Sequence, residues 1–178
     1  LDARALAEAE PNLRPGLAGA LLVREDAVIY PPSAARIFAL EARNRGATLL
    51  LGRRVASFDR EGVRLDNGER VAAGAVVIAT GTSVPELFAA ASIKLRKGHL
   101  AITDRYPGFI RHQLIELGYL KSAHGTDSDS VAFNVQPRKT GQVLIGSSRQ
   151  YGVDDPAVEP RMVSAMLARA KEYMAALG

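Results

Sequence analysis

Hydrophobic and polar residues change their spacing along this chain, and the change divides it into two parts. Residues 1–90 mix helical spacing with short apolar runs, which is typical of helices alternating with strands. Residues 91–178 hold short apolar stretches separated by polar turns, followed by one long helical stretch. Successive strands joined by short turns favour an antiparallel sheet. We therefore predict an α/β (α+β) fold with a division near residue 90.

Four stretches carry helical signals, and nine carry strand signals. The predicted helices are residues 1–10, 33–45, 84–91 and 160–177. The predicted strands are residues 17–23, 48–57, 63–65, 70–71, 75–79, 99–103, 110–120, 130–135 and 142–147. We expect Ser33 to cap the second helix and Gly46 to follow its end. The turn at Asn67-Gly68 tolerates the positive φ of a tight hairpin.

The run Ala75 to Ala79 is the most informative of these stretches. It contains no polar residue that could face solvent, so we predict a strand that is buried on both faces. It ends at Thr80-Gly81, where small residues allow a ligand to approach the backbone. Ligands of open α/β sheets bind just beyond the carboxyl ends of strands, so Thr80, Gly81 and Thr82 are candidate nucleotide contacts.

Composition narrows the possible functions. Of the 178 residues 47% are hydrophobic, which is enough for one sizeable core or two small ones. There is no cysteine, and the three scattered histidines show no metal-ligand spacing, so we expect no metal site. The net charge is +4, but the basic residues are dispersed and no aromatic residues interleave with them, so we expect no nucleic-acid partner. No apolar run reaches membrane-spanning length and no signal peptide is visible, so we expect a cytoplasmic protein without a transmembrane segment.

An ordered set of motifs resembles the amino-acid-oxidase family of FAD-dependent oxidoreductases, which includes glycine oxidase, sarcosine oxidase and D-amino acid dehydrogenase. The resemblance covers nearly the whole chain and depends on the order and spacing of its motifs. These motifs are Leu6–Pro15 (LAEAEPNLRP), Tyr30–Ser33 (YPPS), Gly46-Ala47, the strand ending near Val55, the Asn67-Gly68 hairpin, Ala79-Thr80-Gly81, Lys97-Gly98-His99 and Gln136–Gly141 (QPRKTG) followed by VLIGSS.

The resemblance implies FAD as the cofactor and a small amine or amino acid as the substrate. By position it implies a partial FAD-binding, Rossmann-like domain over residues 1–90 and a substrate-binding antiparallel sheet with a closing helix over residues 91–178. The implied cofactor-binding residues are Arg54, Val55, Ala56, Ala79, Thr80, Gly81, Lys97 and Gly98. The implied substrate-binding residues are Asn134 and Arg138, and no catalytic acid or base is required because the flavin does the chemistry. Arg138 has a second interpretation as an exposed hairpin arginine, and His99 is expected to be a residue of the sheet rather than an acid–base group.

The chain also departs from the family pattern. It lacks the G-x-G-x-x-G fingerprint after a first strand and the later G-x-R-P segment, and it begins at Leu1 without methionine. We therefore expect an internal fragment that binds FAD weakly or not at all and is inactive alone. A sheet that lacks its first strand exposes an edge, so we expect strand pairing between copies, and hence a homo-oligomer, or local disorder.

Two other functions stay open. The first is a non-catalytic binding or interaction module that uses a related sheet, because a fold alone does not fix a function. The second is a nucleic-acid binder, which only the basic isoelectric point favours. We expect the parent protein to oxidise the C–N bond of a D-amino acid, glycine or an N-methylated amino acid by hydride transfer to the flavin.

Overall fold

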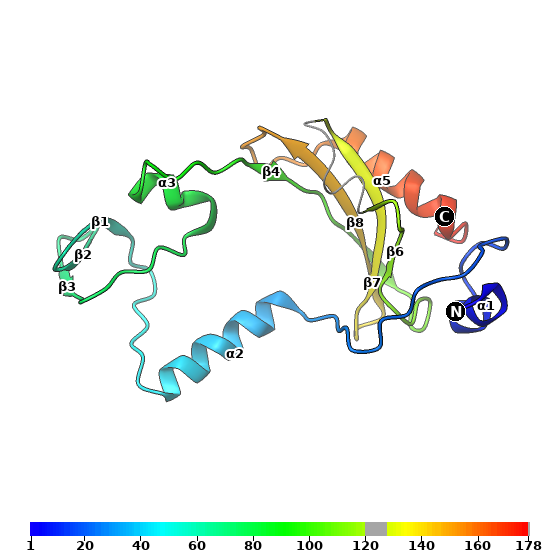
Figure 1. Cartoon of the computed structure of the whole chain (residues 1–178), viewed down its shortest axis with the longest axis horizontal. Helices are drawn as coiled ribbons and strands as arrows, with labels where there is room; N and C mark the ends of the chain where they lie inside the picture. Colours follow the sequence, from blue (N-terminus) through cyan, green and yellow to red (C-terminus); the bar gives the residue numbers. More distant parts are fainter. Residues whose placement is uncertain (120–127, 178) are drawn as a thin grey trace. The chain divides into compact units, whose positions relative to one another are not determined.

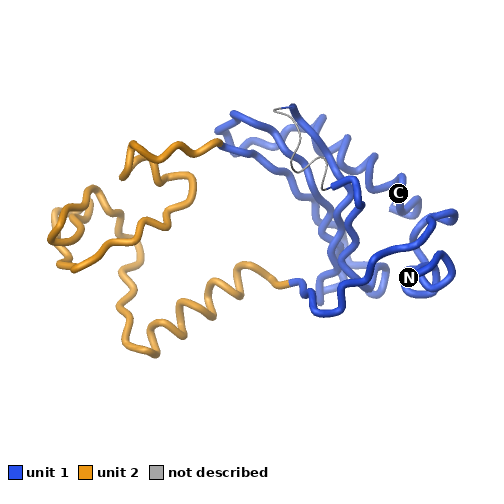
Figure 2. The backbone as a smooth tube through the Cα atoms, viewed as in Figure 1, with its two compact units in different colours: residues 1–28, 95–178 blue, residues 29–94 orange. Residues whose placement is uncertain are grey.

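The computed structural model describes residues 1–119 and 128–177, and the chain forms two compact units (Figure 1, Figure 2). Unit 1 combines residues 1–28 with residues 95–178, and unit 2 is residues 29–94. The second boundary lies close to the division expected at residue 90. The first 28 residues, however, pack with the later half of the chain. The nucleotide-binding and substrate-binding roles of the two parts stay predictions.

Unit 1 is an antiparallel sheet with a helix packed on one face. Its elements are α1 (Ala3–Ala9), β4 (Arg96–Lys97), β5 (Ala101–Arg105), β6 (Leu114–Ile115), β7 (Ser130–Pro137), β8 (Gln142–Tyr151) and α5 (Pro160–Tyr173). The strand order is β4-β8-β7-β6, and β5 also pairs with β8. Helix α5 packs along β7 and β8 (Figure 1). The predicted α+β class and the antiparallel sheet with its closing helix are confirmed.

The core of unit 1 lies between α5 and the sheet. Alternate residues of each strand face the helix, because successive side chains of a strand point to opposite faces. The core residues are Ile110, Phe133, Val135, Val143, Ile145, Met166, Ala170 and Met174. The ring of Phe133 stacks on that of Tyr173, with 4.4 Å between their centroids. Each fully buried Val, Ile, Phe or Met side chain contributes about 1.5–3 kcal/mol, so the contact between α5 and the sheet stabilises the unit.

The buried carboxylate of Glu116 links α5 to the sheet. It accepts hydrogen bonds from the backbone N–H of Phe133 at 2.7 Å and the Tyr173 hydroxyl at 2.9 Å, and it forms an ion pair with Arg169. Burial raises the pKa of Glu116, but the hydrogen bonds from Arg169, the Phe133 backbone and Tyr173 together outweigh it and lower the pKa. The carboxylate is therefore held ionised inside the unit.

A second buried carboxylate ties the N-terminal segment to the same unit. Glu10 is 2% exposed and accepts hydrogen bonds from the backbone N–H groups of Arg111, at 3.0 Å, and His112, at 2.7 Å. The imidazole Nδ1 of His112 lies 2.7 Å from the same carboxylate. Asn12 Nδ2 adds a 2.7 Å hydrogen bond to the Phe109 carbonyl. These contacts explain why residues 1–28 belong to unit 1.

Unit 2 contains a three-stranded antiparallel sheet and two helices of unequal length. Its elements are α2 (Pro31–Asn44), β1 (Val55–Asp59), β2 (Gly62–Leu65), β3 (Arg70–Ala72), the 3-10 turn η1 (Gly81–Ser83) and α3 (Val84–Leu87). The strand order is β1-β2-β3, and β2 and β3 form the hairpin predicted at Asn67-Gly68. Helix α2 begins at Pro31 with Tyr30 as its N-cap, and not at Ser33, because prolines in the first turn are preorganised for the helix and lack only N–H groups that the turn leaves unpaired.

Several predicted strands are wrong. The run 75–79 forms no strand, and Val77 in its centre is 88% exposed, because no described segment pairs with it or covers it. Residues 17–23 contribute only an isolated bridge between Gly19 and Asp2. Within the predicted strand 48–57, the observed strand β1 begins only at Val55. Of residues 110–119 only Leu114–Ile115 form a strand, and residue 120 lies outside the described part. An apolar run becomes a strand only where a neighbour completes its hydrogen-bond ladder.

Within the described part of the chain, no helix is both long enough and apolar enough to cross a membrane. The same residues contain no cluster of histidine, aspartate and glutamate side chains that could hold a metal ion.

Candidate functional site

Unit 2 contains a pocket where the start of β1 faces η1 and α3. The pocket has a volume of about 420 Å³, within the usual range for ligand pockets. It is lined by Arg53, Arg54, Val55, Thr80, Ser83, Glu86 and Leu87. Gly81, at φ +60°, lies in the left-handed region that favours glycine, and no atom lies within 4 Å of the position that a Cβ would take. The backbone beside the pocket is therefore open to a ligand.

The pocket combines four kinds of lining group, one of which is the carboxylate of Glu86. Val55 and Leu87 supply apolar surface, Thr80 and Ser83 supply hydroxyls, and the two arginines supply positive charge. The guanidinium of Arg54 forms an ion pair with Glu86. A hydrogen bond from the Ser83 side chain and the charge of Arg54 lower the pKa of Glu86. Such a set suits a ligand with a flat apolar part and an anionic part.

The structure brings three of the implied cofactor residues into this one pocket: Arg54, Val55 and Thr80. Ala56, Ala79 and Gly81 are their chain neighbours but do not line it. Sequence reasoning missed Arg53, Ser83, Glu86 and Leu87. The signal was present, because the helix predicted at 84–91 follows Thr80-Gly81 directly. A ligand at Thr80-Gly81 must then touch the first turn of that helix.

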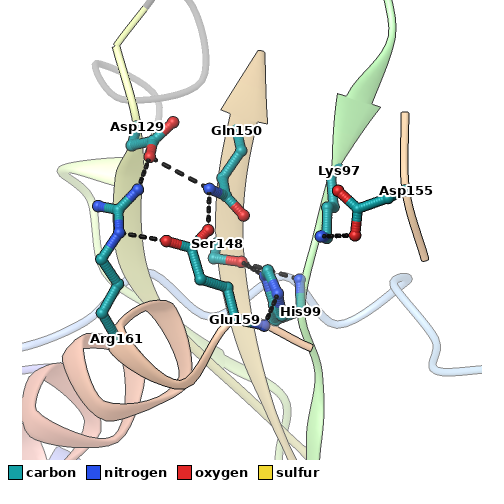
Figure 3. Close-up of polar contacts among 8 residues, drawn as sticks. All are labelled: Lys97, His99, Asp129, Ser148, Gln150, Asp155, Glu159 and Arg161. Atoms are coloured by element: carbon teal, nitrogen blue, oxygen red, sulfur yellow. Dashed lines mark hydrogen bonds and ion pairs between the residues drawn. The ribbon is translucent and has the colours of Figure 1, made fainter. Parts of the chain in front are cut away.

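Lys97 and Gly98 lie in unit 1, beside a smaller pocket of about 190 Å³. Its lining is Lys97, Gly98, His99, Leu100, Pro156, Ala157, Val158 and Val163. The ammonium of Lys97 is 2.9 Å from Asp155 Oδ1 (Figure 3). Hydrogen bonds from Lys97 and from the backbone N–H of Ala157 lower the pKa of Asp155.

His99 belongs to no strand, although the sequence predicted a strand from residue 99. It lies between β4 and β5, is 6% exposed, and has both ring nitrogens occupied (Figure 3). Its Nε2 accepts a hydrogen bond from the backbone N–H of Glu159 at 3.1 Å, so the ring proton lies on Nδ1, 2.9 Å from Ser148 Oγ. A ring held at both nitrogens by protein groups has no free site for proton transfer to a substrate.

A polar network surrounds Gln150, next to His99. Gln150 Nε2 donates to Asp129 and Glu159, and Arg161 forms ion pairs with both carboxylates (Figure 3). Asp129 is thus engaged with Arg161 and Gln150, and the hydrogen bond from Arg161 is the main cause that lowers its pKa. Of the three histidines, His124 lies outside the described residues.

The two implied substrate residues lie on β7 and just after it. Asn134 alternates with the core residues Phe133 and Val135, so its side chain points to the sheet face opposite α5. Its Oδ1 accepts a hydrogen bond from Gln113 Nε2 at 3.3 Å. Arg138 follows the end of β7, is half-buried, and its backbone N–H donates to the Gln142 carbonyl at 2.8 Å.

The structure does not bring Asn134 into the pocket of Lys97 and Gly98. That pocket is lined by Val163 of α5, whereas Asn134 points away from α5. Within unit 1, Lys97 and Gly98 therefore line a pocket that Asn134 does not line.

Two solved structures share this fold. Glycine oxidase from Bacillus cereus ATCC 14579 matches 99% of this chain with a TM-score of 0.79 and 20% identity. Glycine oxidase from Geobacillus kaustophilus matches 99% of this chain with a TM-score of 0.79 and 26% identity. This chain spans 48% and 46% of those two chains, which is about half their length. No curated protein sequence matches the chain.

The family comparison agrees with the resemblance drawn from the motifs. The family model described as "FAD dependent oxidoreductase" matches residues 1–178, the whole of the chain. FAD is thus the cofactor of the family, as the motif order implied. The chain belongs to the FAD-dependent oxidoreductase family.

Proposed function

We propose that this chain is part of an enzyme that oxidises the C–N bond of a small amino acid, with FAD as the hydride acceptor. The substrate class is a D-amino acid, glycine or an N-methylated amino acid. The observation that carries the proposal is the unit 2 pocket, because three residues chosen from the motif order meet in it. Membership of the FAD-dependent oxidoreductase family supports the redox class, and the named glycine oxidases support the choice of substrate class. A cytoplasmic location and a homo-oligomer stay predictions.

The lining of the unit 2 pocket fits part of a dinucleotide cofactor. The apolar side chains of Val55 and Leu87 suit a flat ring, and the hydroxyls of Thr80 and Ser83 suit hydrogen bonds to a sugar. The guanidinium of Arg54 suits a phosphate or a ring face. Bound FAD would supply the electron sink for substrate oxidation. The chain's residues would hold and orient the cofactor at this pocket.

On the substrate side, the proposal assigns binding to Asn134 and Arg138. A guanidinium holds a carboxylate through two parallel hydrogen bonds, which is the role we propose for Arg138. Asn134 presents an uncharged amide on the open face of the sheet. No side chain of the described residues is assigned as a catalytic acid or base.

The experiment is an FAD titration of the full-length protein that carries this sequence, after removal of any bound flavin. We expect Arg54→Ala to weaken FAD binding about 10-fold, the value of one charge-assisted hydrogen bond. Arg60→Ala is the matched control, because Arg60 is an exposed arginine of unit 2 outside the pocket. Equal FAD affinity in both variants and the parent would place the cofactor elsewhere.

A further inference from the structure

One ion pair lies within the lining of the unit 2 pocket. Arg54 directly precedes β1, and Glu86 lies in α3, 32 residues further along the chain. The contact of α3 with β1 brings the two residues together, and both line the pocket. The carboxylate of Glu86 therefore occupies the same guanidinium that the proposed function gives to the cofactor.

The Glu86 carboxylate is both charged and accessible. A hydrogen bond from the Ser83 side chain and, after it, the charge of Arg54 lower the pKa of Glu86, so the group is ionised at neutral pH. The side chains of Arg54 and Glu86 are 73% and 52% exposed, so a ligand that enters the pocket can reach both. An ion pair this exposed is weak, and an anionic ligand can replace the carboxylate at the guanidinium.

The second arginine of the pocket is in a different state. Among the residues that the structure describes, the Arg53 side chain has no recorded hydrogen bond or ion pair. The pocket thus contains two guanidinium groups and one carboxylate, and the carboxylate is paired with Arg54. An anion that enters the pocket meets one available guanidinium and one that is already neutralised.

We propose that Glu86 competes with the phosphate groups of the cofactor for Arg54. Glu86 thereby lowers the affinity of the pocket for anionic ligands and leaves its affinity for uncharged ligands unchanged. It is a specificity-determining residue that limits how tightly the pocket holds a phosphorylated molecule. The inference rests on the proposed function, because it concerns the regulation of the same cofactor pocket.

The chemistry of the guanidinium supports direct competition. Carboxylates and phosphates both accept paired hydrogen bonds from the planar fork of an arginine, so each can take the place of the other. The hydrogen bond from Ser83 keeps the displaced Glu86 carboxylate close to the pocket. A carboxylate held beside a bound phosphate also repels it, which adds to the loss of affinity.

The test is Glu86→Gln in the flavin-free, full-length protein, with FAD, ADP and adenosine as probes in equilibrium binding titrations. The glutamine keeps an oxygen that can accept from Ser83 but carries no charge. Because an exposed ion pair is worth little, we expect FAD and ADP to bind about two- to fivefold more tightly and adenosine to stay within about 1.5-fold of the parent. The gain for ADP should shrink at high salt, because ions screen the competing charges.

Glu41→Gln is the matched control. Glu41 is 55% exposed and pairs with Arg45, which is 79% exposed, and neither residue lines the pocket. This variant removes the same charge from a similarly exposed pair, so we expect all three affinities to stay within about 1.5-fold of the parent. In an Arg54→Ala background there is no guanidinium to compete for, so the gain from Glu86→Gln should disappear.

The inference is overturned if Glu86→Gln leaves the affinities for FAD and ADP unchanged or weakens them, or if its gain persists in full without Arg54. Failure of the proposed function has a different signature. A protein that takes up no FAD, yet binds ADP more tightly as Glu86→Gln, would keep the competition at Arg54 and refute the cofactor role. A protein that binds neither FAD nor ADP would overturn both.

Discussion

The carboxylate of Glu116 fastens α5 to the sheet of unit 1, so Glu116→Gln tests how that unit is stabilised. The glutamine can still accept from the Phe133 N–H, but the ion pair with Arg169 is lost. Removing one partner of a buried ion pair costs about 3–5 kcal/mol. The Arg169 side chain is 34% exposed, so water can solvate it in the variant. We therefore expect the free energy of unfolding to fall by about 3 kcal/mol, the lower end of this range.

The loss of unfolding free energy is measured by urea unfolding, with the near-ultraviolet circular dichroism of the stacked Phe133 and Tyr173 rings as the signal. Glu172→Gln is the matched control, because Glu172 also pairs with Arg169 but is 58% exposed. An exposed pair is worth at most about 1 kcal/mol, so the control should lose far less stability. Equal losses in the two variants would refute the role of the buried carboxylate.

The same residue gives a pH dependence with a defined sign. The pKa of Glu116 is lowered in the folded chain from its usual value of 4.5. A carboxylate with a lowered folded pKa stabilises the fold above the unfolded pKa and loses that contribution as the pH falls through the folded pKa. The stability difference between the parent and Glu116→Gln should therefore be full at pH 7 and shrink below 4.5. A difference that stays constant into the acid range would contradict this account.

Two further substitutions test local structure. His99→Phe keeps an aromatic ring, of larger volume, but removes both ring hydrogen bonds, so we expect a loss of about 1–3 kcal/mol in unfolding free energy, measured by urea unfolding. A variant as stable as the parent would show that these hydrogen bonds do not stabilise the fold. Gly62→Ala places a Cβ 2.1 Å from the Val71 carbonyl oxygen at φ +138°, so we expect a loss of about 2 kcal/mol or more and a loosened β2–β3 hairpin, seen as faster amide exchange. Gly74→Ala, with open space at its Cβ, is the control and should stay within about 0.5 kcal/mol of the parent.

The elements that the sequence predicted well are those whose partners lie nearby in the chain. β7 and β8 are joined by a tight hairpin, and α5 packs on both, so alternation and helical spacing were enough to predict them. The hairpin at Asn67-Gly68 is local in the same way. In each case the residues that form the sequence pattern and the residues that pack against them lie within a few tens of residues of one another in the chain.

The prediction of a strand at residues 75–79 was wrong because the segment has no pairing strand nearby in the chain. An apolar run shows that a segment is suited to burial, but it does not show that a pairing strand is present. In this structure Val77 is exposed, and no described strand pairs with the segment. The related glycine oxidase chains are about twice as long, so half of their length has no counterpart here.

The candidate site was predicted in part. The resemblance of motif order led to Arg54, Val55 and Thr80, because those motifs lie along β1 and the 79–81 turn. Glu86 and Leu87 were missed because the contact of α3 with β1 was not predicted, although the helix itself was. The Gln113–Asn134 amide pair also depends on tertiary structure, since the pairing of β6 with β7 brings the two residues together.

We propose that this chain serves an FAD-dependent amino-acid oxidation. Its most direct test is the absorbance spectrum of the full-length protein purified without added cofactor, followed by anaerobic addition of glycine, D-amino acids and N-methylated glycines. We expect the two absorption bands of oxidised flavin, and their bleaching by at least one of these substrates. A colourless protein that also fails to take up added FAD would contradict the account and favour a non-catalytic binding module.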